Sequence, residues 1–353
     1  MNILGIETSC DETAAAVVST TGEAARPWRM RSNVIASQTE VHREWGGVVP
    51  ELASRQHVRD ICGVVERALA DASCEWPDID ALAVTQGPGL VGSLLVGVSF
   101  AKAAAAALDR PIVAVHHLAG HIESIWLEHG DIPLPAVVLV VSGGHTSLYE
   151  VRDRGRYRLV GRTRDDAAGE AYDKVARLLG LGYPGGPVVD RRAKTGNDHA
   201  VALPRPRFTG PSRSKRHIDG MTEFSFSGLK SAAVRLLQQR SASGPLSETE
   251  VADFCASFQR VVVETLVEQT FTTARTLGAK SVGIAGGVSA NSRLRADAAG
   301  RGVLEGLPVF VPALSLSTDN AAMIAAAGLR RLELAGPSAL DFNADPSLAM
   351  GVG

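Results

Sequence analysis

Residues 3–18 read ILGIETSCDETAAAVV. The mostly apolar runs Ile3–Glu7 and Thr13–Val18 have the length and composition of short β-strands. Between them, Thr8–Glu12 is polar and acidic, as is typical of a tight connection. The stretch therefore predicts a hairpin whose tip carries the carboxylates Asp11 and Glu12.

The second half of the chain repeats this design. Ala136–Val141 is an apolar, β-branched run, Ser142-Gly143-Gly144-His145 is a glycine turn, and Thr146–Val151 reads as a returning strand. Because the strand–turn–strand unit occurs twice, the sequence predicts a duplicated α/β fold with two lobes and a cleft between them.

Other segments alternate strands with helices. The apolar spacing within Glu51–Ala70 predicts a helix. Strands at Ala81–Thr85, Pro111–Val115 and Ser281–Ala285 are followed in turn by predicted helices at Val91–Leu108, His116–Trp126 and Ser289–Ala298. Ser289 is the predicted N-cap of the last helix.

The bulk composition limits the class of protein. A chain of 353 residues suggests about two domains. The predicted division is an N-terminal lobe of residues 1–115, to which about 325–345 return, and a C-terminal lobe of residues 116–324. Hydrophobic residues make up 45% and the net charge is -2, which excludes a disordered chain and a bulk polycation. Binding of nucleic acid would therefore need a local patch or a partner.

The compartment is predicted from cysteines and hydropathy. The cysteines form no C-x-x-C pair and indicate neither a zinc finger nor a disulfide framework; they are Cys10, Cys62, Cys74 and Cys255. The chain begins directly with a strand and shows no basic leader. The most apolar stretch, Leu90–Leu108, is interrupted by polar residues and reads as a buried helix. We expect a cytoplasmic protein that does not contact a membrane.

A candidate metal site comes from two histidines in HHLAGH, residues 116–121. His117 and His121 are four residues apart, so a helix places them on one face. Two surface histidines would show the same spacing. Asp319 follows a predicted apolar strand and opens a predicted helix, and it is the strongest candidate for a third ligand. Two histidines and one carboxylate leave open coordination positions, which favours Fe(II), with Zn(II) as the second choice.

Glycine loops suggest a nucleotide site, because their backbone N–H groups can hold phosphate. They lie at residues 86–89, 142–145, 183–187 and 286–287. None matches the Walker A or the dinucleotide-binding pattern, and any one of them could be only a tight turn. Four such loops beside a candidate metal site favour a nucleotide site.

Longer motifs resemble those of the universal tRNA threonylcarbamoyladenosine transferase family, bacterial branch, whose members formerly carried the label O-sialoglycoprotein endopeptidase. The resemblance covers nearly the whole chain in order, at Gly5–Thr13, His116–His121, Val141–Thr146, Gly169–Lys174, Tyr183–Pro187, Phe224–Lys230 and Ala285–Asn291. It implies an actin/hexokinase/Hsp70-like (ASKHA) fold. It also implies transfer of the threonylcarbamoyl group from threonylcarbamoyl-adenylate to the exocyclic amine of adenosine 37, in tRNAs that read codons beginning with A, with release of AMP.

The resemblance also implies roles for single residues. His117, His121 and Asp319 match the family's iron ligands. The positions that match its adenylate contacts are Val140, Val141, Ser142, Gly143, Gly144, Asp173, Gly186, Asp190 and Asn291. The implied partners are tRNA, a paralogous non-catalytic subunit and a small ATPase. One segment departs from the family pattern, since Phe208–Glu223 looks longer and more basic than expected.

The acceptor amine must lose a proton during transfer, and Asp11 or Glu12 is the predicted general base. Either residue could instead be a solvated turn residue. Three other functions stay open at this point. They are an ASKHA-type small-molecule kinase, a metallopeptidase and a regulatory protein that binds a nucleotide without turnover. The missing glutamate of an H-E-x-x-H motif argues against the peptidase.

Overall fold

The computed structural model describes residues 1–205, 221–241 and 244–350. The described chain divides into two compact units. The first unit contains Met1–Ile132, Arg152–Tyr157 and the residues from Pro312 onward. The second contains Pro133–Val151 and Arg158–Val311. Each unit is built on its own mixed β-sheet, which agrees with the predicted α/β class.

The first unit contains a sheet of order β3-β2-β1-β5-β6, with β4 also paired to β2. Its strands are β1 Asn2–Glu7, β2 Glu12–Thr20, β3 Trp28–Met30, β4 Val34–Ser37, β5 Ala81–Gly87 and β6 Ile112–His116. Strands β1 and β2 are antiparallel, with Ile3 opposite Val18, so the predicted first hairpin is confirmed. Strands β1, β5 and β6 are parallel.

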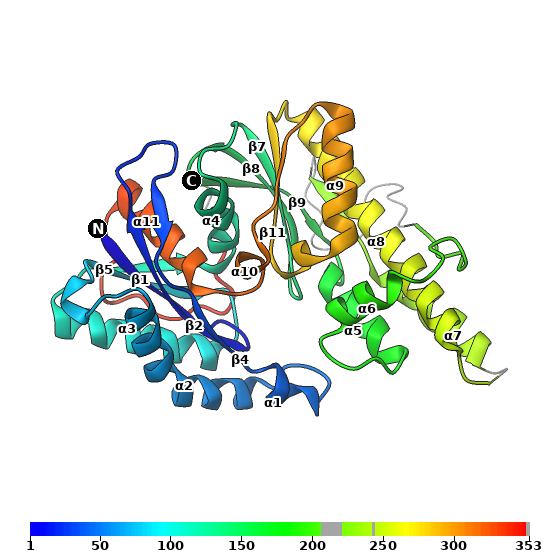
Figure 1. Ribbon diagram of the computed structural model, residues 1–353, viewed down its shortest axis with the longest axis horizontal. Coiled ribbons are helices and arrows are strands. Elements are labelled where there is room, and N and C mark those ends of the chain that lie inside the picture. The colour runs from blue at the N-terminus through cyan, green and yellow to red at the C-terminus, as the bar shows by residue number, and fades with distance from the viewer. Residues whose placement is uncertain (206–220, 242–243, 351–353) are drawn as a thin grey trace. The chain divides into compact units, whose positions relative to one another are not determined.

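Helices cover both faces of this sheet (Figure 1). The helices of the first unit are α1 Thr39–Arg43, α2 Pro50–Asp71, α3 Val91–Leu108, α4 His117–His129, α10 Leu314–Ser317 and α11 Ala321–Ala335, with a 3-10 turn η1 at Trp76–Asp78. Of these, α2, α3, α4 and α11 pack against the sheet. Leu4 and Ile6 belong to the core shared with α2 and α3, because alternate strand residues point to opposite faces. Gly5 points the other way, toward α11, where an added Cβ would lie 2.3 Å from the carbonyl oxygen of Ala321.

Helix α3 is long and apolar enough to cross a membrane by length and composition alone. In the first unit it packs against the sheet through Leu94, Val98 and Ala101, all of which are buried. The opposite face is open, since Val91 and Leu95 are exposed, so the prediction of a buried helix holds for one face only.

The second unit contains a sheet of order β10-β9-β8-β7-β11-β12. Its strands are β7 Ala136–Val141, β8 Thr146–Asp153, β9 Arg156–Thr163, β10 Thr222–Phe224, β11 Ser281–Ala285 and β12 Val309–Phe310. Strands β7 and β8 are antiparallel, so the second hairpin is also confirmed. Strand β11 runs parallel to β7, which brings the loops after both strands to one edge of the sheet.

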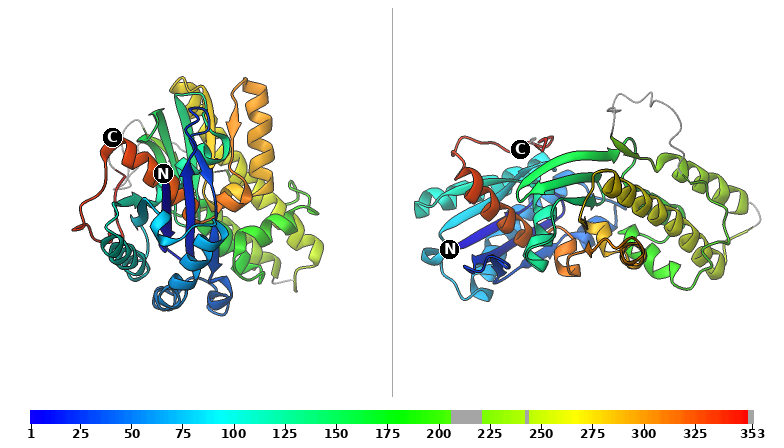
Figure 2. Two further views of the ribbon diagram at one scale, coloured as in Figure 1. Left: turned by 60° about the vertical axis from the view of Figure 1, so that its left-hand side comes forward. Right: turned by 90° about the horizontal axis from the view of Figure 1, so that it is seen from above.

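The helices of the second unit are α5 Ala168–Leu178, α6 Gly185–Ala193, α7 Ser227–Ser241, α8 Glu248–Thr276 and α9 Ser292–Glu305, with a 3-10 turn η2 at Gly287–Ala290. Helices α8 and α9 lie beside the sheet (Figure 2). The core between sheet and helices is rich in aromatic rings, including Tyr172 edge-on to Phe258 with ring centroids 5.3 Å apart. Such a core gives a rigid support for the loops at the sheet edge.

Two local predictions were wrong. Helix α9 begins at Ser292, and its N-cap is Asn291, whose Oδ1 accepts from the backbone N–H of Leu294 at 2.9 Å. Ser289, the predicted cap, lies in η2 and is buried. Asp319 is preceded by the short helix α10 and not by an apolar strand.

Candidate functional site

The structure brings His117, His121 and Asp319 together within the first unit. Helix α4 begins where β6 ends, so both histidines lie in its first two turns, and Asp319 lies between α10 and α11. The Nε2 atoms of His117 and His121 are 3.5 Å and 3.2 Å from Oδ1 of Asp319. One ligand atom from each residue lies within 4.8 Å of the others, so the set can hold a single ion.

The surroundings of His121 fit a metal ligand. The residue is fully buried, and within the described part of the chain neither ring nitrogen makes a hydrogen bond. Its Nε2 is 3.2 Å from Asp319, but the orientation does not satisfy hydrogen-bond geometry. An unpaired buried polar atom costs roughly 1–3 kcal/mol. A divalent cation bound to His121 would offset that cost, and two imidazoles with one carboxylate are a donor set for Fe(II) or Zn(II).

Glu7 is a functional candidate that the sequence analysis did not assign. Its carboxylate is fully buried at the end of β1 and lies 3.1 Å from Nδ1 of His117. It also accepts hydrogen bonds from the hydroxyl of Thr85 at 2.7 Å and from the backbone N–H of Ser9. A carboxylate behind a metal-binding histidine fixes the ring so that its other nitrogen faces the ion. The sequence did contain a signal for Glu7, because an acidic residue at the end of an apolar strand is unusual.

The charge balance at His117 follows from this arrangement. Burial alone would lower its pKa, but the carboxylates of Asp319 and Glu7 outweigh burial and raise the pKa of His117 to about 9. When no metal ion is bound, the negative charges of Asp319 and Glu7 stabilise the protonated form of His117. The same charges would stabilise a bound metal cation. A metal ion must displace that proton when it binds.

The predicted bases lie on the β1–β2 turn of the same unit. Asp11 is buried and Glu12 is half-buried at the start of β2. Burial, reinforced by the nearby carboxylates of Asp319 and Asp11, raises the pKa of Glu12 well above its ordinary value. A raised pKa makes the ionised carboxylate a stronger base, and only that ionised form can take up a proton.

The second unit carries the predicted adenylate contacts. Val140 and Val141 are fully buried in β7, so only their backbone atoms can face a ligand. In the following turn, the Ser142 N–H donates to the carbonyl of His145 at 2.8 Å. Gly143 and Gly144 are exposed, and added Cβ atoms there would meet nothing within 4 Å, so the turn has room beside it.

Asp190 and Asn291 are joined by a residue that the sequence analysis missed. Gln259 on α8 donates from Nε2 to Asp190 Oδ1 at 3.1 Å, and its Oε1 accepts from Asn291 Nδ2 at 2.8 Å. The hydroxyl of Ser292 also donates to Asp190 at 2.8 Å. Gln259 carried no motif signal, because its position on a long helix shows nothing of its neighbours in space.

Asp173 and Gly186 lie at a second junction of the same unit. Asp173 on α5 accepts a hydrogen bond from the backbone N–H of Gly185, at the start of α6, at 2.7 Å. An added Cβ on Gly186 would meet nothing within 4 Å, so α6 begins at an open position. Among the predicted site residues, the metal ligands and predicted bases belong to the first unit and the predicted adenylate contacts to the second.

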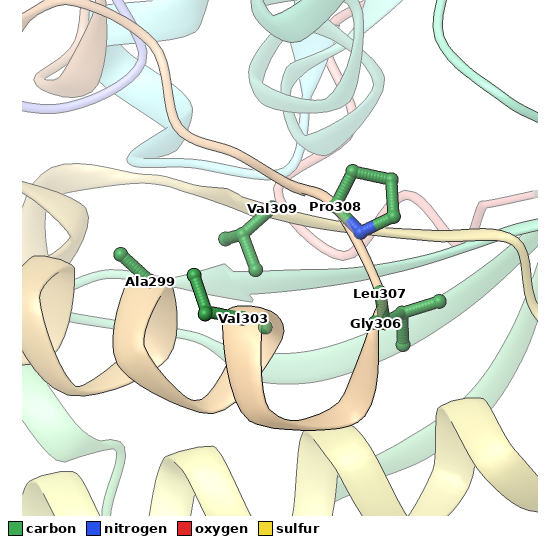
Figure 3. Close-up of a pocket in the computed structure, with 7 residues that line it drawn as sticks. Ala299, Val303, Gly306, Leu307, Pro308 and Val309 are labelled. Carbon is green, nitrogen blue, oxygen red and sulfur yellow. The ribbon is translucent and has the colours of Figure 1, made fainter.

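A cavity of about 410 Å³ at the C-terminal end of α9 is unrelated to these residues (Figure 3). Its lining is apolar and consists of Ala299, Gly302, Val303, Gly306, Leu307, Pro308 and Val309. Since these side chains carry no acid, base, nucleophile or metal ligand, the cavity offers no catalytic chemistry.

Comparison with known proteins gives a consistent result. Residues 29–326 match the sequence model of a family described as tRNA N6-adenosine threonylcarbamoyltransferase. A protein of that name from Moorella thermoacetica is 50% identical over 349 residues, which cover 99% of this chain and 97% of the relative. One from Anaeromyxobacter dehalogenans is 51% identical over 349 residues, covering 98% of each.

Solved structures support the fold. The full-length HypF structure in its phosphate- and nucleotide-bound form superposes with a TM-score of 0.58 at 13% identity, covering 96% of this chain and 47% of HypF. At this level of identity the likeness concerns the fold alone. It agrees with the predicted ASKHA architecture.

Proposed function

Since the chain belongs to the tRNA N6-adenosine threonylcarbamoyltransferase family, we propose that it takes its threonylcarbamoyl group from threonylcarbamoyl-adenylate and releases AMP. The enzyme transfers that group to the N6 atom of an adenosine in tRNA. The proposed acceptor is adenosine 37 in tRNAs that read codons beginning with A. The observation that carries the proposal is that about half of the residues are identical to those of enzymes named for this activity, over nearly their full length. None of the comparisons favours a kinase or a peptidase.

The proposed metal is Fe(II), with Zn(II) as the second choice, held by His117, His121 and Asp319. When bound, the ion would act as a Lewis acid toward the threonylcarbamoyl oxygens. Glu7 would hold His117 through Nδ1, so that its Nε2 stays directed at Asp319.

The adenylate is assigned to the second unit. Backbone N–H groups of Gly143 and Gly144 would hold the phosphate, for which the open space at the two glycines gives room. The N–H of Ser142 is bonded to the carbonyl of His145, so Ser142 would hold this turn in place. Asp173 would accept from the ribose hydroxyls. Val140, Val141, Gly186, Asp190 and Asn291 complete the proposed set of adenylate contacts.

In the transfer step, N6 of the adenosine attacks the carbamoyl carbon, the bond to the phosphate oxygen breaks, and AMP leaves. The attacking amine loses one proton. The candidate acceptors of that proton are Asp11 and Glu12, which lie on the β1–β2 turn. The raised pKa of Glu12 makes its carboxylate the stronger base once it is ionised. A cation bound nearby would lower the pKa of Glu12. The pKa during the reaction would therefore depend both on burial, which raises it, and on the cation, which lowers it.

The proposed partners are tRNA, a paralogous non-catalytic subunit and a small ATPase, and the proposed location is the cytoplasm. Co-purification of the chain with each candidate partner, with and without tRNA, tests that set.

The direct test of function is mass spectrometry of tRNA nucleosides after incubation with threonylcarbamoyl-adenylate. Wild-type protein should form threonylcarbamoyladenosine, and His117→Ala and His121→Ala should lose both metal and transfer activity while staying folded. The reason is that two remaining ligands hold a divalent ion far less well than three. A metal-free His117→Ala protein that modifies tRNA at the wild-type rate would show that the ion has only a structural role.

A further inference from the structure

The backbone of the β1–β2 turn is held by three donors. The carbonyl of Ser9 accepts from the N–H of Leu90 at 2.8 Å, and the carbonyl of Asp11 accepts from the N–H of Gln38 at 2.9 Å. The carbonyl of Cys10, between them, accepts from Nε2 of His57 at 3.0 Å. The first two donors are backbone groups that any residue would supply. His57 is therefore the one donor of the three that depends on residue type.

His57 is the end of a longer chain of polar contacts. Its Nδ1 lies 2.7 Å from the hydroxyl of Thr13 and 3.3 Å from Nε2 of Gln38. Oε1 of Gln38 lies 3.3 Å from Nε2 of His42. Nδ1 of His42 accepts from the backbone N–H of Val49 at 3.3 Å. The side chains involved are almost wholly buried, with exposures of 0% for His42, His57 and Thr13 and 1% for Gln38.

The partners fix the proton positions. A carbonyl oxygen only accepts, so Nε2 of His57 must carry a hydrogen. Burial lowers the pKa of His57 against the opposing effects of the Cys10 carbonyl, Glu7 and Asp11, which leaves the ring neutral and its Nδ1 an acceptor. Nδ1 of His42 accepts from a backbone N–H, so the hydrogen of that ring lies on Nε2 and is donated to Gln38.

With the protons placed in this way, each hydrogen bond in the series from Val49 to Cys10 pairs one donor with one acceptor. The direction runs from Val49 through His42 and Gln38 to His57, and ends on the carbonyl of Cys10. Burying so many polar groups costs free energy unless every group is hydrogen-bonded. Apolar side chains could fill the same volume without this cost, so the polar network points to a role beyond packing. The carbonyl at the end of the chain directly precedes Asp11 and Glu12.

We propose that His57 is a positioning residue for the transfer reaction, held as its Nε2–H tautomer by His42 and Gln38 so that it fixes the turn bearing Asp11 and Glu12. This inference rests on the proposed function, in which that turn supplies the general base. It assigns His57 no contact with substrate.

The test compares three substitutions at one position. In His57→Gln, an amide N–H can replace Nε2–H and still reach the Cys10 carbonyl. In His57→Asn, the shorter amide occupies the position of Nδ1 and can bond Thr13 but not Cys10. In His57→Leu, both contacts are lost. His199→Leu, at an exposed histidine of the second unit, is the matched control.

We expect His57→Leu and His57→Asn to lower the single-turnover transfer rate by about 100-fold, the scale for a catalytic group misplaced by an ångström. Their donor affinity and metal content should stay at the wild-type level, and His57→Gln should recover most of the rate. If His57→Leu does not fold, the Asn and Gln pair still decides the question. A wild-type rate in His57→Asn, or loss of metal in parallel with rate, would overturn the proposal.

Nitrogen-15 NMR of the histidine rings gives a readout that does not need activity. In the wild-type protein, His57 should appear as the Nε2–H tautomer, and Gln38→Leu should change its Nδ1 shift by removing one donor. An Nδ1–H tautomer in the wild type would overturn the assignment. If the wild-type protein does not modify tRNA, the proposed function fails, and the NMR result still decides whether Nε2 of His57 carries the hydrogen that the Cys10 carbonyl accepts.

Discussion

The imidazole of His117 lies between two carboxylates, with Glu7 at Nδ1 and Asp319 at Nε2. The two contacts have different consequences. Asp319 is a candidate ligand that would share a bound ion with Nε2, whereas Glu7 is fully buried and would act only through the ring. The basicity and orientation of His117 therefore depend on a residue outside the set of ligands.

Replacing Glu7 with Gln should weaken metal binding without removing a ligand. The expected loss is about 10- to 100-fold in affinity, the range found for outer partners of metal-binding histidines. Competition with a chelator measures it, and Glu51→Gln on the exposed face of α2 is the control. Wild-type affinity in Glu7→Gln would mean that the carboxylate does not orient the ring.

Asn291 has a structural task beside its proposed contact with the adenylate, since it caps α9 and pairs with Gln259. Asn291→Ala should raise the KM for the adenylate and also reduce stability by about 1 kcal/mol through loss of the cap. Ser247→Ala removes the cap of α8, where Ser247 accepts from the N–H of Glu250, at a place with no proposed substrate contact. It should lower stability in thermal unfolding and leave KM unchanged. Equal KM values for both variants would contradict the binding role of Asn291.

At the scale of elements, helix α11 is held close to β1 by a residue without a side chain. An added Cβ at Gly5 would lie 2.3 Å from the carbonyl oxygen of Ala321 and 2.8 Å from the backbone nitrogen of Ala325. Backbone atoms cannot move aside alone, so the whole helix would shift. Asp319 lies just before that helix, and its distance to the histidines depends on where α11 begins.

Gly5→Ala should therefore destabilise the protein by about 1–3 kcal/mol, as overpacking does, and lower its metal content as well. Gly63→Ala in α2 is the matched control, because its Cβ would meet nothing within 4 Å. That control should be neutral or stabilising by about 0.5–1 kcal/mol. Thermal unfolding and metal analysis of both variants measure the two effects. A Gly5→Ala protein with full metal content would show that α11 does not set the position of Asp319.

The elements differ in how far the sequence could predict them. Both hairpins follow from pairs of apolar runs that flank a short polar or glycine turn, and the structure has them at β1–β2 and β7–β8. The start of α9 could not be predicted, because Ser289 and Asn291 are both good caps and only the 3-10 turn between Gly287 and Ala290 decides between them. Contacts such as Gln259 with Asn291 join residues 32 apart in the chain, and spacing within one helix does not reveal them.

For the whole molecule, binding of tRNA has to overcome a net charge of -2. The sequence offers a local basic group in Arg213, Lys215 and Arg216, which lie outside the described residues. We propose that these three residues contact tRNA phosphates. A solvated charged loop would have the same composition.

Replacing Arg213, Lys215 and Arg216 together with Ala should weaken tRNA binding and flatten its dependence on salt. Each lost phosphate contact should reduce the slope of log affinity against log salt by about 0.7–0.9. Binding titrations at several salt concentrations measure the slope, and Arg55→Ala in an exposed ion pair of α2 is the control. An unchanged slope in the triple variant would assign the segment another role.

The first unit is discontinuous, and its parts are separated in the chain by nearly all of the second. A ribosome therefore completes the second unit at Val311, while the earlier-made first unit still lacks α11 and Asp319. Domains tend to fold as units during synthesis, as soon as their residues are available. The face of β1 that packs against α11 must accordingly stay uncovered until α11 has been made, and the candidate metal site can close only after residue 319 has left the exit tunnel.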